Sequence, residues 1–338
     1  MQDIHAVVNK LLQPSDALIA DMAALEGDLV ILGAGGKIGP SLARLAKQAI
    51  DRSGAPRKVT AISRFSEPGL KAALEKDGIE THAADLMNEA ALQALPYAQN
   101  VLYLAGTKFG TTGKEPFTWA MNTYLPGRVA ERYKEARVVV YSTGNVYPFT
   151  PVGSGGADES CAPAPVGEYG QSCLGRERVF QHFSERYRSP LLIYRLNYAN
   201  DLRYGVLLEI AKAVKEERAI DLSMGHVNVI WQGDANEFAL RALHHCELPA
   251  GILNITGPET ASVRWLAETF GKIFRKTPVF TGEEQPTALL SNAAESFRRF
   301  GYPKVPLIRM IQLTADWLEA GGATISKPTH FQEREGQF

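Results

Sequence analysis

The sequence predicts an α/β protein: a doubly wound parallel sheet with helices on both faces, followed by a smaller C-terminal lobe. Two observations carry this prediction. Short apolar stretches of strand length alternate with segments of helical periodicity through the first part of the chain. The first of these strands enters a cluster of glycines in the segment 30–39, VILGAGGKIG, and a helical pattern follows at 41–49. Strand, glycine turn and helix in this order are typical of the first unit of such a sheet.

The glycines of this turn have the spacing GxxGxxG, through Gly33, Gly36 and Gly39. The more general spacing GxGxxG does not fit, because Ile38 stands where its third glycine would be. Glycines leave room for a tight turn and for a pyrophosphate, which binds at the N–H groups and the positive end of the following helix. Nucleotide binding is therefore the favoured interpretation. An ordinary strand-to-helix loop is the alternative.

The chain divides into a helical N-terminal extension, a nucleotide-binding core, a smaller lobe interleaved with that core, and a tail, which span residues 1–27, 28–200, 201–320 and 321–338. The extension is expected to form two short helices, 3–13 and 16–26, with Ser15 or Asp16 as the N-cap of the second. A nucleotide-binding core normally begins at its first strand. We therefore expect the extension to pack on the outside or on a partner, and the tail to be extended or docked on a neighbour.

Further strands and helices of the core and of the lobe follow from the same periodicities. The core strands are expected at 58–63, 80–83, 100–105, 137–141 and 191–196, and the core helices at 69–76, 118–135 and 168–180. The lobe is expected to contain helices near 204–217, 234–245, 262–274 and 306–319 and short strands near 227–231 and 252–255.

The strand at 58–63 ends in Ser63 and Arg64. In dinucleotide-binding folds, an acidic residue near this point binds the ribose hydroxyls of NAD. A serine and a guanidinium instead suit the 2′-phosphate of NADP, because arginine binds phosphate and stacks on adenine. Lys37, inside the glycine loop, adds a second cation nearby. These residues favour NADP over NAD, and the alternative is that both cations are solvated surface charges.

The strand at 100–105 leads into Gly106, Thr107 and Lys108. In an open parallel sheet, residues just beyond the carboxyl ends of strands line the ligand crevice. Lys108 is therefore expected to face the ligand, although most loop lysines are simply solvated.

The composition excludes several classes of function. Lys and Arg number 36 against 37 Asp and Glu, so no basic excess favours nucleic acid as a partner. The three cysteines have no CxxC spacing, which fits a reducing cytoplasm. Asp3 and the lack of a long apolar run argue against a signal peptide or membrane anchor at the start. His244, His245 and Cys246 lack a further ligand at metal spacing, so no metal is expected.

Together these motifs resemble the extended short-chain dehydrogenase/reductase superfamily, in its NAD(P)-dependent epimerase/dehydratase family, over about residues 29–318. The resemblance implies a Rossmann-type fold. It rests on Gly33, Gly36 and Gly39, on Asp85 and Leu86, on Leu104, Ala105 and Gly106, on Ser142, Thr143, Val146 and Tyr147, and on the helix that starts near Tyr169.

The resemblance also implies site residues. In that family the glycine loop, which here includes Lys37 and Ile38, holds the pyrophosphate, and the residues matching Asp85 and Leu86 hold the adenine. Leu104, Ala105, Gly106 and Tyr169 are counted with the cofactor-binding residues. The acid/base roles fall on Thr143 and Tyr169, and Asn197 matches an asparagine that touches the substrate phosphates in sugar-nucleotide relatives.

The implied function is hydride transfer on a sugar, sugar nucleotide or sugar-derived hydroxy compound. Reduction, epimerisation and dehydration all begin with this step, so the sequence does not separate them. Family likeness further implies a homodimer, formed through a four-helix contact that includes the helix of Tyr169.

One family signature departs from its pattern. Where the family has YxxxK, this chain has Tyr169 followed by Cys173. The family lysine holds the nicotinamide ribose and stabilises the tyrosinate, and lowering a tyrosine pKa from about 10 to about 7 requires about 4 kcal/mol. We expect Lys108 to supply the missing charge and Cys173 to be a small buried thiol. Arg176 lies two helical turns from Tyr169, about 10 Å along the axis, and would have to strain to reach the Tyr169 hydroxyl. The alternative function is a catalytically impaired NAD(P)-binding sensor or scaffold.

Overall fold

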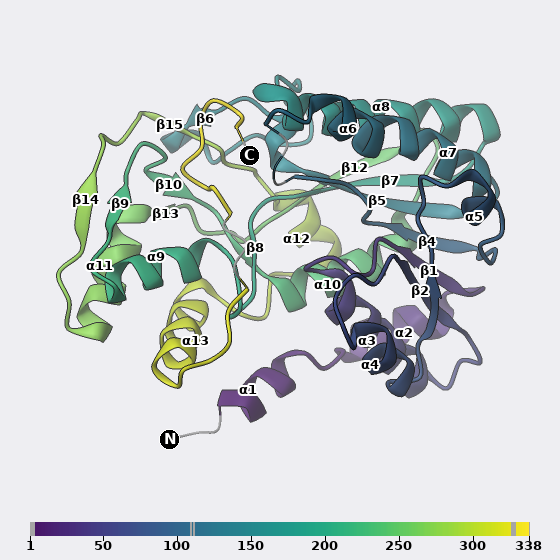
Figure 1. Ribbon diagram of the computed structural model, residues 1–338, viewed down its shortest axis with the longest axis horizontal. Coiled ribbons are helices and arrows are strands. Elements are labelled where there is room, and N and C mark those ends of the chain that lie inside the picture. The colour runs from purple at the N-terminus through teal and green to yellow at the C-terminus, as the bar shows by residue number, and fades with distance from the viewer. Residues whose placement is uncertain (1–3, 109, 111, 326–328, 338) are drawn as a thin grey trace.

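The computed structural model describes residues 4–108, 110, 112–325 and 329–337 and has one seven-stranded parallel sheet, which lies on the right in Figure 1. The strand order is β12-β7-β5-β4-β1-β2-β3. Their bounds are β1 (Leu29–Leu32), β2 (Val59–Ser63), β3 (Glu80–Ala83), β4 (Asn100–Tyr103), β5 (Arg137–Thr143), β7 (Leu191–Leu196) and β12 (Gly251–Ile255). The chain changes direction across the sheet between β1 and β4, so the loop after β1 opens at the topological switch point. The predicted doubly wound parallel sheet is confirmed.

Helices cover both faces of this sheet (Figure 1). One face carries α2 (Asp16–Ala24), α3 (Gly39–Ser53), α4 (Leu70–Lys76) and α10 (Gln232–Arg241), and the other carries α5 (Glu89–Gln93), α7 (Leu125–Arg132) and α8 (Gly167–Tyr187). Successive strand residues point to opposite faces. Leu29 and Ile31 accordingly pack in the core on the side of α3, and Val30 and Leu32 pack in the core on the side of α7. Burial on both faces explains why the strands are continuously apolar.

The helix after the glycine loop, α3, buries the apolar face that the sequence predicts, with Leu42, Ala46 and Ala49 fully buried. Pro40 lies in its first turn, where no N–H partner is lost. The helix ends at Gly54, which has the left-handed φ of 72° that glycine adopts without strain.

The N-terminal extension packs on this same chain. Helix α1 (Ile4–Leu11) contributes apolar side chains to the lobe. Helix α2 begins at the N-cap Ser15, whose side chain accepts the Leu18 N–H at 3.1 Å, as predicted. Leu18 and Met22 are completely buried in the core under β1. The expectation that the whole extension lies outside the core is therefore wrong for α2. Residue 3, the expected start of the first helix, lies outside the described residues.

The helix predicted at 118–135 is interrupted. It consists of α6 (Glu115–Trp119), a π-helical turn (Ala120–Tyr124) and α7. Pro126 has no N–H to give to the carbonyl four residues earlier, at Asn122. This missing donor accounts for the widened turn, and such turns are frequent at functional sites.

The lobe lies to the left of the sheet in Figure 1 and has its own apolar core. Its helices are α9 (Val206–Lys215), α11 (Val263–Phe274) and α13 (Leu307–Glu319). Small two-stranded sheets join β9 (Ala219–Asp221) to β14 (Val279–Thr281), β10 (His226–Val227) to β13 (Ala261–Ser262), β8 (Ala199–Asn200) to β11 (Ile230–Trp231), and β6 (Thr150–Pro151) to β15 (Thr287–Ala288). The strand expected near 252–255 extends the core sheet as β12. The sequence did not predict α5 or α12 (Ala294–Phe300).

The C-terminal segment, residues 329–337, crosses the front of the molecule in yellow in Figure 1. The Arg334 guanidinium donates to the Thr287 carbonyl at 2.8 Å and lies 4.3 Å from the centroid of the Phe149 ring. Gly336 packs so closely on Gly167 that a Cβ added to Gly167 would lie 2.5 Å from the Gly336 oxygen. This segment therefore docks on its own chain, beside the start of α8. Residues 326–328 of the tail lie outside the described residues.

Candidate active site

A cavity of about 600 Å³, here called the strand-end cavity, lies at the carboxyl ends of β1, β4, β5 and β7. It brings together many of the residues predicted from the sequence, namely Gly33, Gly36, Lys37, Ile38, Gly39, Leu104, Gly106, Lys108, Thr143, Tyr169 and Asn197. Residues far apart in the sequence thus meet at the switch point of the sheet, where α/β folds bind ligands.

Five predicted cofactor residues do not line this cavity. Arg64 and Asp85 are exposed at the ends of β2 and β3, and Leu86 and Ala105 are buried in the core. Ser63 lies beside the glycine loop, since a Cβ added to Gly35 would be 2.3 Å from the Ser63 Oγ. Their cofactor-binding roles remain predictions.

The three motif glycines serve different purposes. Gly33 has φ 87°, and an added Cβ would lie 2.7 Å from the backbone nitrogen of Ala105. At Gly39 an added Cβ would lie 2.3 Å from the Ala34 oxygen, so the contacts of the protein itself require both glycines. Gly36 meets only the Gly33 oxygen, at 3.5 Å, and it lines the cavity. The middle glycine therefore leaves space for a ligand.

The three residues predicted to be catalytic meet in this cavity. Thr143 is the last residue of β5, and Tyr169 lies in the first turn of α8. Their side chains are hydrogen-bonded to each other, and both are more than nine-tenths buried. The Lys108 Nζ lies 5.3 Å from the centroid of the Tyr169 ring. The site therefore combines the hydroxyl groups of Thr143 and Tyr169 with the ammonium group of Lys108.

Burial raises the pKa of Tyr169 well above its ordinary value of 10. The neighbouring Cys173 raises the pKa further, whereas Arg176 and the hydrogen bond with Thr143 lower it. Near neutral pH the Tyr169 hydroxyl is therefore protonated and able to donate a proton.

Cys173 stands where the family signature has a lysine, and its side chain is completely buried. Burial raises the pKa of its thiol, and the side chain hydrogen-bonds with Tyr169. Cys173 is therefore a neutral thiol that fills the space beside Tyr169, as expected.

Burial lowers the pKa of Lys108 to about 8. The charge of Lys37 also lowers this pKa, while Cys173 and Glu209 raise it. The Lys108 ammonium is consequently charged at neutral pH and loses its charge under mildly alkaline conditions.

Arg176 lies closer to the site than its spacing suggests. Its guanidinium lines the strand-end cavity, donating from Nη1 to the Tyr141 carbonyl at 2.9 Å and from Nη2 to the Asn122 Oδ1 at 2.8 Å. The long side chain spans the rise of the helix and brings the guanidinium into the cavity that Tyr169 also lines. The charge of Arg176 lowers the pKa of Tyr169.

Asn122 was not identified from the sequence. Its Oδ1 accepts the Thr107 N–H at 2.9 Å, and its Nδ2 donates to the Thr107 carbonyl at 2.9 Å and to the Ser172 Oγ at 3.0 Å. Asn122 thereby ties the loop of Lys108 to α8. Pro126 was the one local signal for the π-helical turn that positions Asn122.

A network of buried charged and polar side chains connects the strands and the helix that carry the site. The Arg195 and Glu177 side chains are 1% and 0% exposed and form an ion pair at 2.6 Å. The Ser142 Oγ donates to Glu177 at 2.5 Å, and Arg195 donates to the Tyr147 hydroxyl at 2.7 Å. Tyr147 in turn donates to Asn254 at 2.9 Å. These contacts fix β5, α8, β7 and β12 relative to one another.

The lobe and the C-terminal segment complete the cavity wall. Asn197 lies on this wall, and its Nδ2 donates to the Asn228 Oδ1 at 2.8 Å. The Lys37 Nζ lies 4.6 Å from the centroid of the Tyr204 ring. Thr329 also lines the cavity, and its backbone N–H donates to Glu209. No sequence pattern indicated the contributions of Tyr204 and Thr329.

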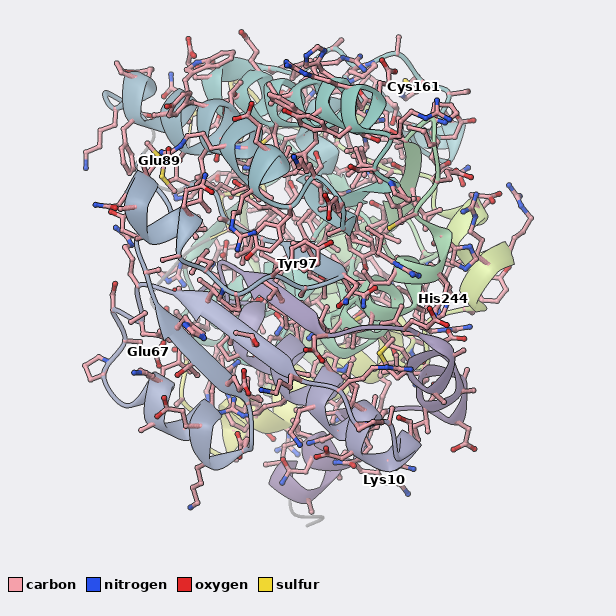
Figure 2. All side chains as sticks on the ribbon, turned by 90° about the vertical axis from the view of Figure 1, so that its right-hand side faces the viewer. Lys10, Glu67, Glu89, Tyr97, Cys161 and His244 are labelled. Carbon is pink, nitrogen blue, oxygen red and sulfur yellow. The ribbon has the colours of Figure 1, made fainter. Side chains whose placement is uncertain are left out.

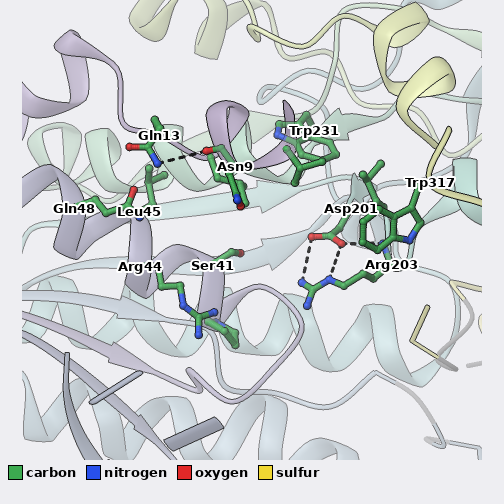
Figure 3. A pocket seen from close by; sticks show the side chains of 14 residues that line it. Asn9, Gln13, Ser41, Arg44, Leu45, Gln48, Asp201, Arg203, Trp231 and Trp317 are labelled. Carbon is green, nitrogen blue, oxygen red and sulfur yellow. Dashed lines mark hydrogen bonds and ion pairs between the residues drawn. The ribbon is translucent and has the colours of Figure 1, made fainter. Parts of the chain in front are cut away.

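A second cavity of about 460 Å³ lies beside α1, α3 and α13 (Figure 3). Trp231 and Trp317 line it, together with the Asp201–Arg203 ion pair at 2.9 Å. None of the residues predicted from the sequence borders this cavity. The predicted catalytic residues therefore belong to the strand-end cavity and not to this one.

No three described His, Cys, Asp or Glu side chains lie together as a metal site. Figure 2 shows Cys161 well apart from His244. Across the described ranges, no helix has both the length and the apolar character needed to cross a bilayer.

The doubly wound sheet, the glycine loop at its switch point and the pair Thr143 and Tyr169 together have the arrangement of a Rossmann-type dinucleotide fold. Comparison with protein-family models and with curated proteins finds no match. Among solved structures, the chain is similar to UDP-glucuronic acid 4-epimerase from Bacillus cereus in complex with NAD, with 20% identity and a TM-score of 0.71 over 87% of this chain and 99% of that chain.

Two further structures are similar over nearly the same span. UDP-glucose 4-epimerase from Thermus thermophilus, in complex with NAD, is 19% identical with a TM-score of 0.68 over 86% of this chain and 99% of that chain. Pal from Bacillus thuringiensis is 14% identical with a TM-score of 0.70 over 87% of this chain and 99% of that chain. At these identities the likeness establishes the shared fold. The resemblance drawn from the sequence is confirmed at that level.

Proposed function

We propose that this protein is an NAD(P)-dependent enzyme that transfers hydride to or from a sugar, sugar nucleotide or sugar-derived hydroxy compound. The observation that carries the proposal is the meeting of Thr143, Tyr169 and Lys108 with the glycine loop in one cavity. The titles of the two epimerase structures name NAD and UDP-sugars, which supports this class of cofactor and substrate.

The cavity fits a nicotinamide dinucleotide. Gly36 leaves space beside the start of α3. The described lining residues include Lys37, Lys108 and Arg176 but no Asp or Glu, so every charged side chain among them would attract a diphosphate. The residues proposed to hold the pyrophosphate and the neighbouring ribose are Gly33, Gly36, Lys37, Ile38, Gly39, Leu104, Ala105, Gly106 and Tyr169. Asp85 and Leu86 would hold the adenine, and Ser63 and Arg64 the 2′-phosphate of NADP.

A bound nicotinamide supplies the acceptor or donor of the hydride. The chain supplies the proton. Tyr169, neutral near pH 7, donates its hydroxyl proton to the substrate oxygen when a carbonyl is reduced and becomes a tyrosinate. In the oxidising direction the tyrosinate accepts the proton of the substrate hydroxyl. Thr143 hydrogen-bonds with Tyr169 and holds the same substrate oxygen. The Lys108 ammonium stabilises the negative charge that develops on Tyr169, and Asn197 contacts the substrate from the lobe side.

The test uses nucleotide binding and consumption. We expect the protein to quench or enhance the fluorescence of NADH or NADPH on binding, and to consume one of them with a member of a panel of ketosugars and UDP-sugars. Tyr169→Phe should still bind the nucleotide, at most about tenfold more weakly, and lose about 100-fold or more in turnover. Tyr187→Phe, which alters a tyrosine at the far end of α8, serves as the matched control. A protein that binds neither nucleotide contradicts the proposal.

The raised pKa of Tyr169 and the thiol at Cys173 favour a second candidate, a nucleotide sensor or scaffold without turnover. If the protein is a sensor or scaffold, the same experiment should show tight binding of reduced nucleotide and no consumption with any member of the panel.

We also propose that the protein forms a homodimer through the outer face of α6, α7 and α8. An apolar groove of about 610 Å³ lies there, lined in part by Trp119, Tyr124 and Phe183. Arg128 and Glu131 border the same groove. If a two-fold axis passes between Arg128 and Glu131, each charge faces the opposite charge of the other copy, which makes a second copy of the chain the proposed occupant.

A further inference from the structure

Arg176 retains hydrogen-bond donors that the described protein does not use. A guanidinium has five N–H bonds. Its Nη1 donates to the Tyr141 carbonyl and its Nη2 to Asn122, while its buried Nε has no partner in the described part of the chain. Arg176 is only 7% exposed, so little bulk solvent reaches these donors. Buried donors without acceptors are rare and costly, which indicates that a ligand completes this group.

The guanidinium also lies against Gly106, which lines the strand-end cavity. A Cβ added to Gly106, just beyond β4, would be 2.4 Å from the Arg176 Nη2. Tyr169, Cys173 and Arg176 follow one another along one side of α8, and the charge of Arg176 acts on both neighbours. Arg176 thus stands one turn beyond the position at which the family signature has its lysine.

The position of this charge is fixed. Asn122 is itself bonded to Thr107 and Ser172, so the acceptor that holds the Arg176 Nη2 cannot swing away easily. Unlike the Lys108 ammonium, a guanidinium keeps its charge at any pH at which the protein is folded. Of the two cations beside Tyr169, Arg176 is therefore the permanent one and Lys108 the titratable one.

We propose that Arg176 donates hydrogen bonds to the ribose hydroxyls of the nicotinamide nucleoside and so holds the cofactor in place of the lysine that the YxxxK signature supplies. This inference rests on the proposed function. It divides the work of that lysine: Arg176 holds the ribose, and Lys108 supplies the charge that stabilises the tyrosinate. The loss of lysine at Cys173 and the guanidinium at Arg176 are then two parts of one arrangement.

The test compares two nucleotides that differ in the nicotinamide nucleoside. NADH contains it and ADP lacks it. With fluorescence titration for NADH and calorimetry for ADP, Arg176→Met should weaken NADH binding by about 10- to 100-fold and leave ADP binding within about threefold. Arg178→Met, an exposed arginine two residues along α8, should change neither affinity.

Two further variants separate a direct contact from structural damage. Arg176→Lys keeps the charge with fewer donors and should lose about 3- to 10-fold in NADH affinity alone. Cys173→Lys combined with Arg176→Met restores a lysine at the signature position. It should recover most of the NADH affinity, which a lysine would not do if Arg176 merely braced Asn122 and Tyr141.

The outcomes are distinct. A wild-type protein that binds neither NADH nor ADP overturns the proposed function and this inference with it. Unchanged NADH affinity in Arg176→Met, with normal wild-type binding, overturns only the role of Arg176. An equal loss for NADH and ADP assigns Arg176 a structural role and overturns the inference as well.

Discussion

The Lys108 Nζ lies 5.3 Å from the centroid of the Tyr169 ring, over its face. Burial shifts the pKa values of these two neighbours in opposite directions, lowering that of Lys108 to about 8 and raising that of Tyr169. Their protonation states at neutral pH follow directly: a charged lysine beside a neutral tyrosine. Pairs of titratable groups separated in this way are typical of acid/base sites.

Lys108→Met should change how nucleotide binding depends on pH. In the wild type, the affinity for NADH should fall as pH rises through about 8, because the Lys108 ammonium loses its charge there and the ligand is an anion. The variant should bind about 3- to 10-fold more weakly at pH 7 and show no such fall. Fluorescence titrations between pH 6.5 and pH 9.5, chosen to span about one unit either side of this pKa, measure both quantities. A fall of the same size in Lys108→Met would assign the pH dependence to another group.

The same substitution should stabilise the protein. The pKa of Lys108 is about 8 when folded and about 10.4 when unfolded, so between these values the unfolded state binds more protons and stability rises with pH. The cost of the buried charge is therefore fully present below pH 8. Urea denaturation at pH 7 should show Lys108→Met to be more stable by about 1 kcal/mol, and the gain should vanish near pH 10.5. Equal stability at pH 7 would contradict the lowered pKa of Lys108.

Glu177→Gln should destabilise the fold. The substitution keeps the shape of the side chain but leaves the charge of Arg195 buried without its counterion. The expected loss in the free energy of unfolding is about 3–5 kcal/mol, measured by urea denaturation. Adding Arg195→Met should recover part of the loss, because the uncompensated charge is then removed.

Glu216→Gln is the matched control for this prediction. Glu216 pairs with Arg218 at 2.6 Å, but both side chains are about half exposed, so the change should be below about 1 kcal/mol. If Glu177→Gln costs no more than this surface substitution, the network does not depend on the charge of Glu177.

Local patterns predicted the core strands well. The strands β3 and β7 match their expected ranges, because runs of strand-forming residues bounded by turn residues are visible in the sequence itself. Strand β5 runs two residues further than expected, to Thr143, because Thr143 pairs with Leu196 of β7. Such pairing is nonlocal, so no local pattern contains it. The break before α7 depends on Pro126, which helical periodicity alone does not reveal.

The same distinction applies to the site. Residues that follow strand ends, such as Gly33, Lys108 and Thr143, were predictable because the sheet gathers all carboxyl ends at one edge. The reach of a long side chain is not readable from spacing, so the sequence did not indicate that the Arg176 guanidinium lines the cavity. Thr329 comes from the opposite end of the chain and carries no motif. Its place in the cavity follows from the docking of the C-terminal segment alone.

Arg64→Glu should reverse the choice of cofactor. We expect the wild type to bind NADPH about tenfold or more tightly than NADH, because a guanidinium at the end of β2 pairs with the 2′-phosphate. A carboxylate at this position repels that phosphate and accepts hydrogen bonds from the ribose hydroxyls of NADH. Affinities for both nucleotides, measured by fluorescence, give the ratio. Lys76→Glu, an exposed change on α4, should leave it unaltered. A wild type that prefers NADH would contradict the prediction.

Tyr124→Asp should separate the proposed dimer. Tyr124 is 60% exposed on the outer face of α6–α8, where a carboxylate would be buried against the apolar groove of a second copy. Sedimentation velocity at micromolar concentration should show the wild type at twice the mass of the variant. Tyr302→Asp changes a tyrosine that is 72% exposed after α12 and should remain dimeric. A monomeric wild type would contradict the proposed dimer.

Gly336→Ala should release the C-terminal segment. Gly336 has φ 78°, and an added Cβ would lie 2.5 Å from the Val166 oxygen and 2.6 Å from the Gly167 Cα. Neither backbone can move away without displacing the start of α8, which carries Tyr169. The alanine should therefore undock the segment and expose Arg334.

Limited trypsin digestion, followed by intact mass measurement, shows whether the C-terminal segment is docked and needs no ligand. Cleavage after Arg334 should become at least about tenfold faster in Gly336→Ala, because the hydrogen bonds of Arg334 to Thr287 are then lost. Gly153→Ala is the control, since an added Cβ there meets nothing within 4 Å. NADH should slow cleavage of the wild type, because Thr329 lines the cavity that the nucleotide would fill. Equal cleavage rates in Gly336→Ala and the wild type would show that the segment is not fastened at Gly336.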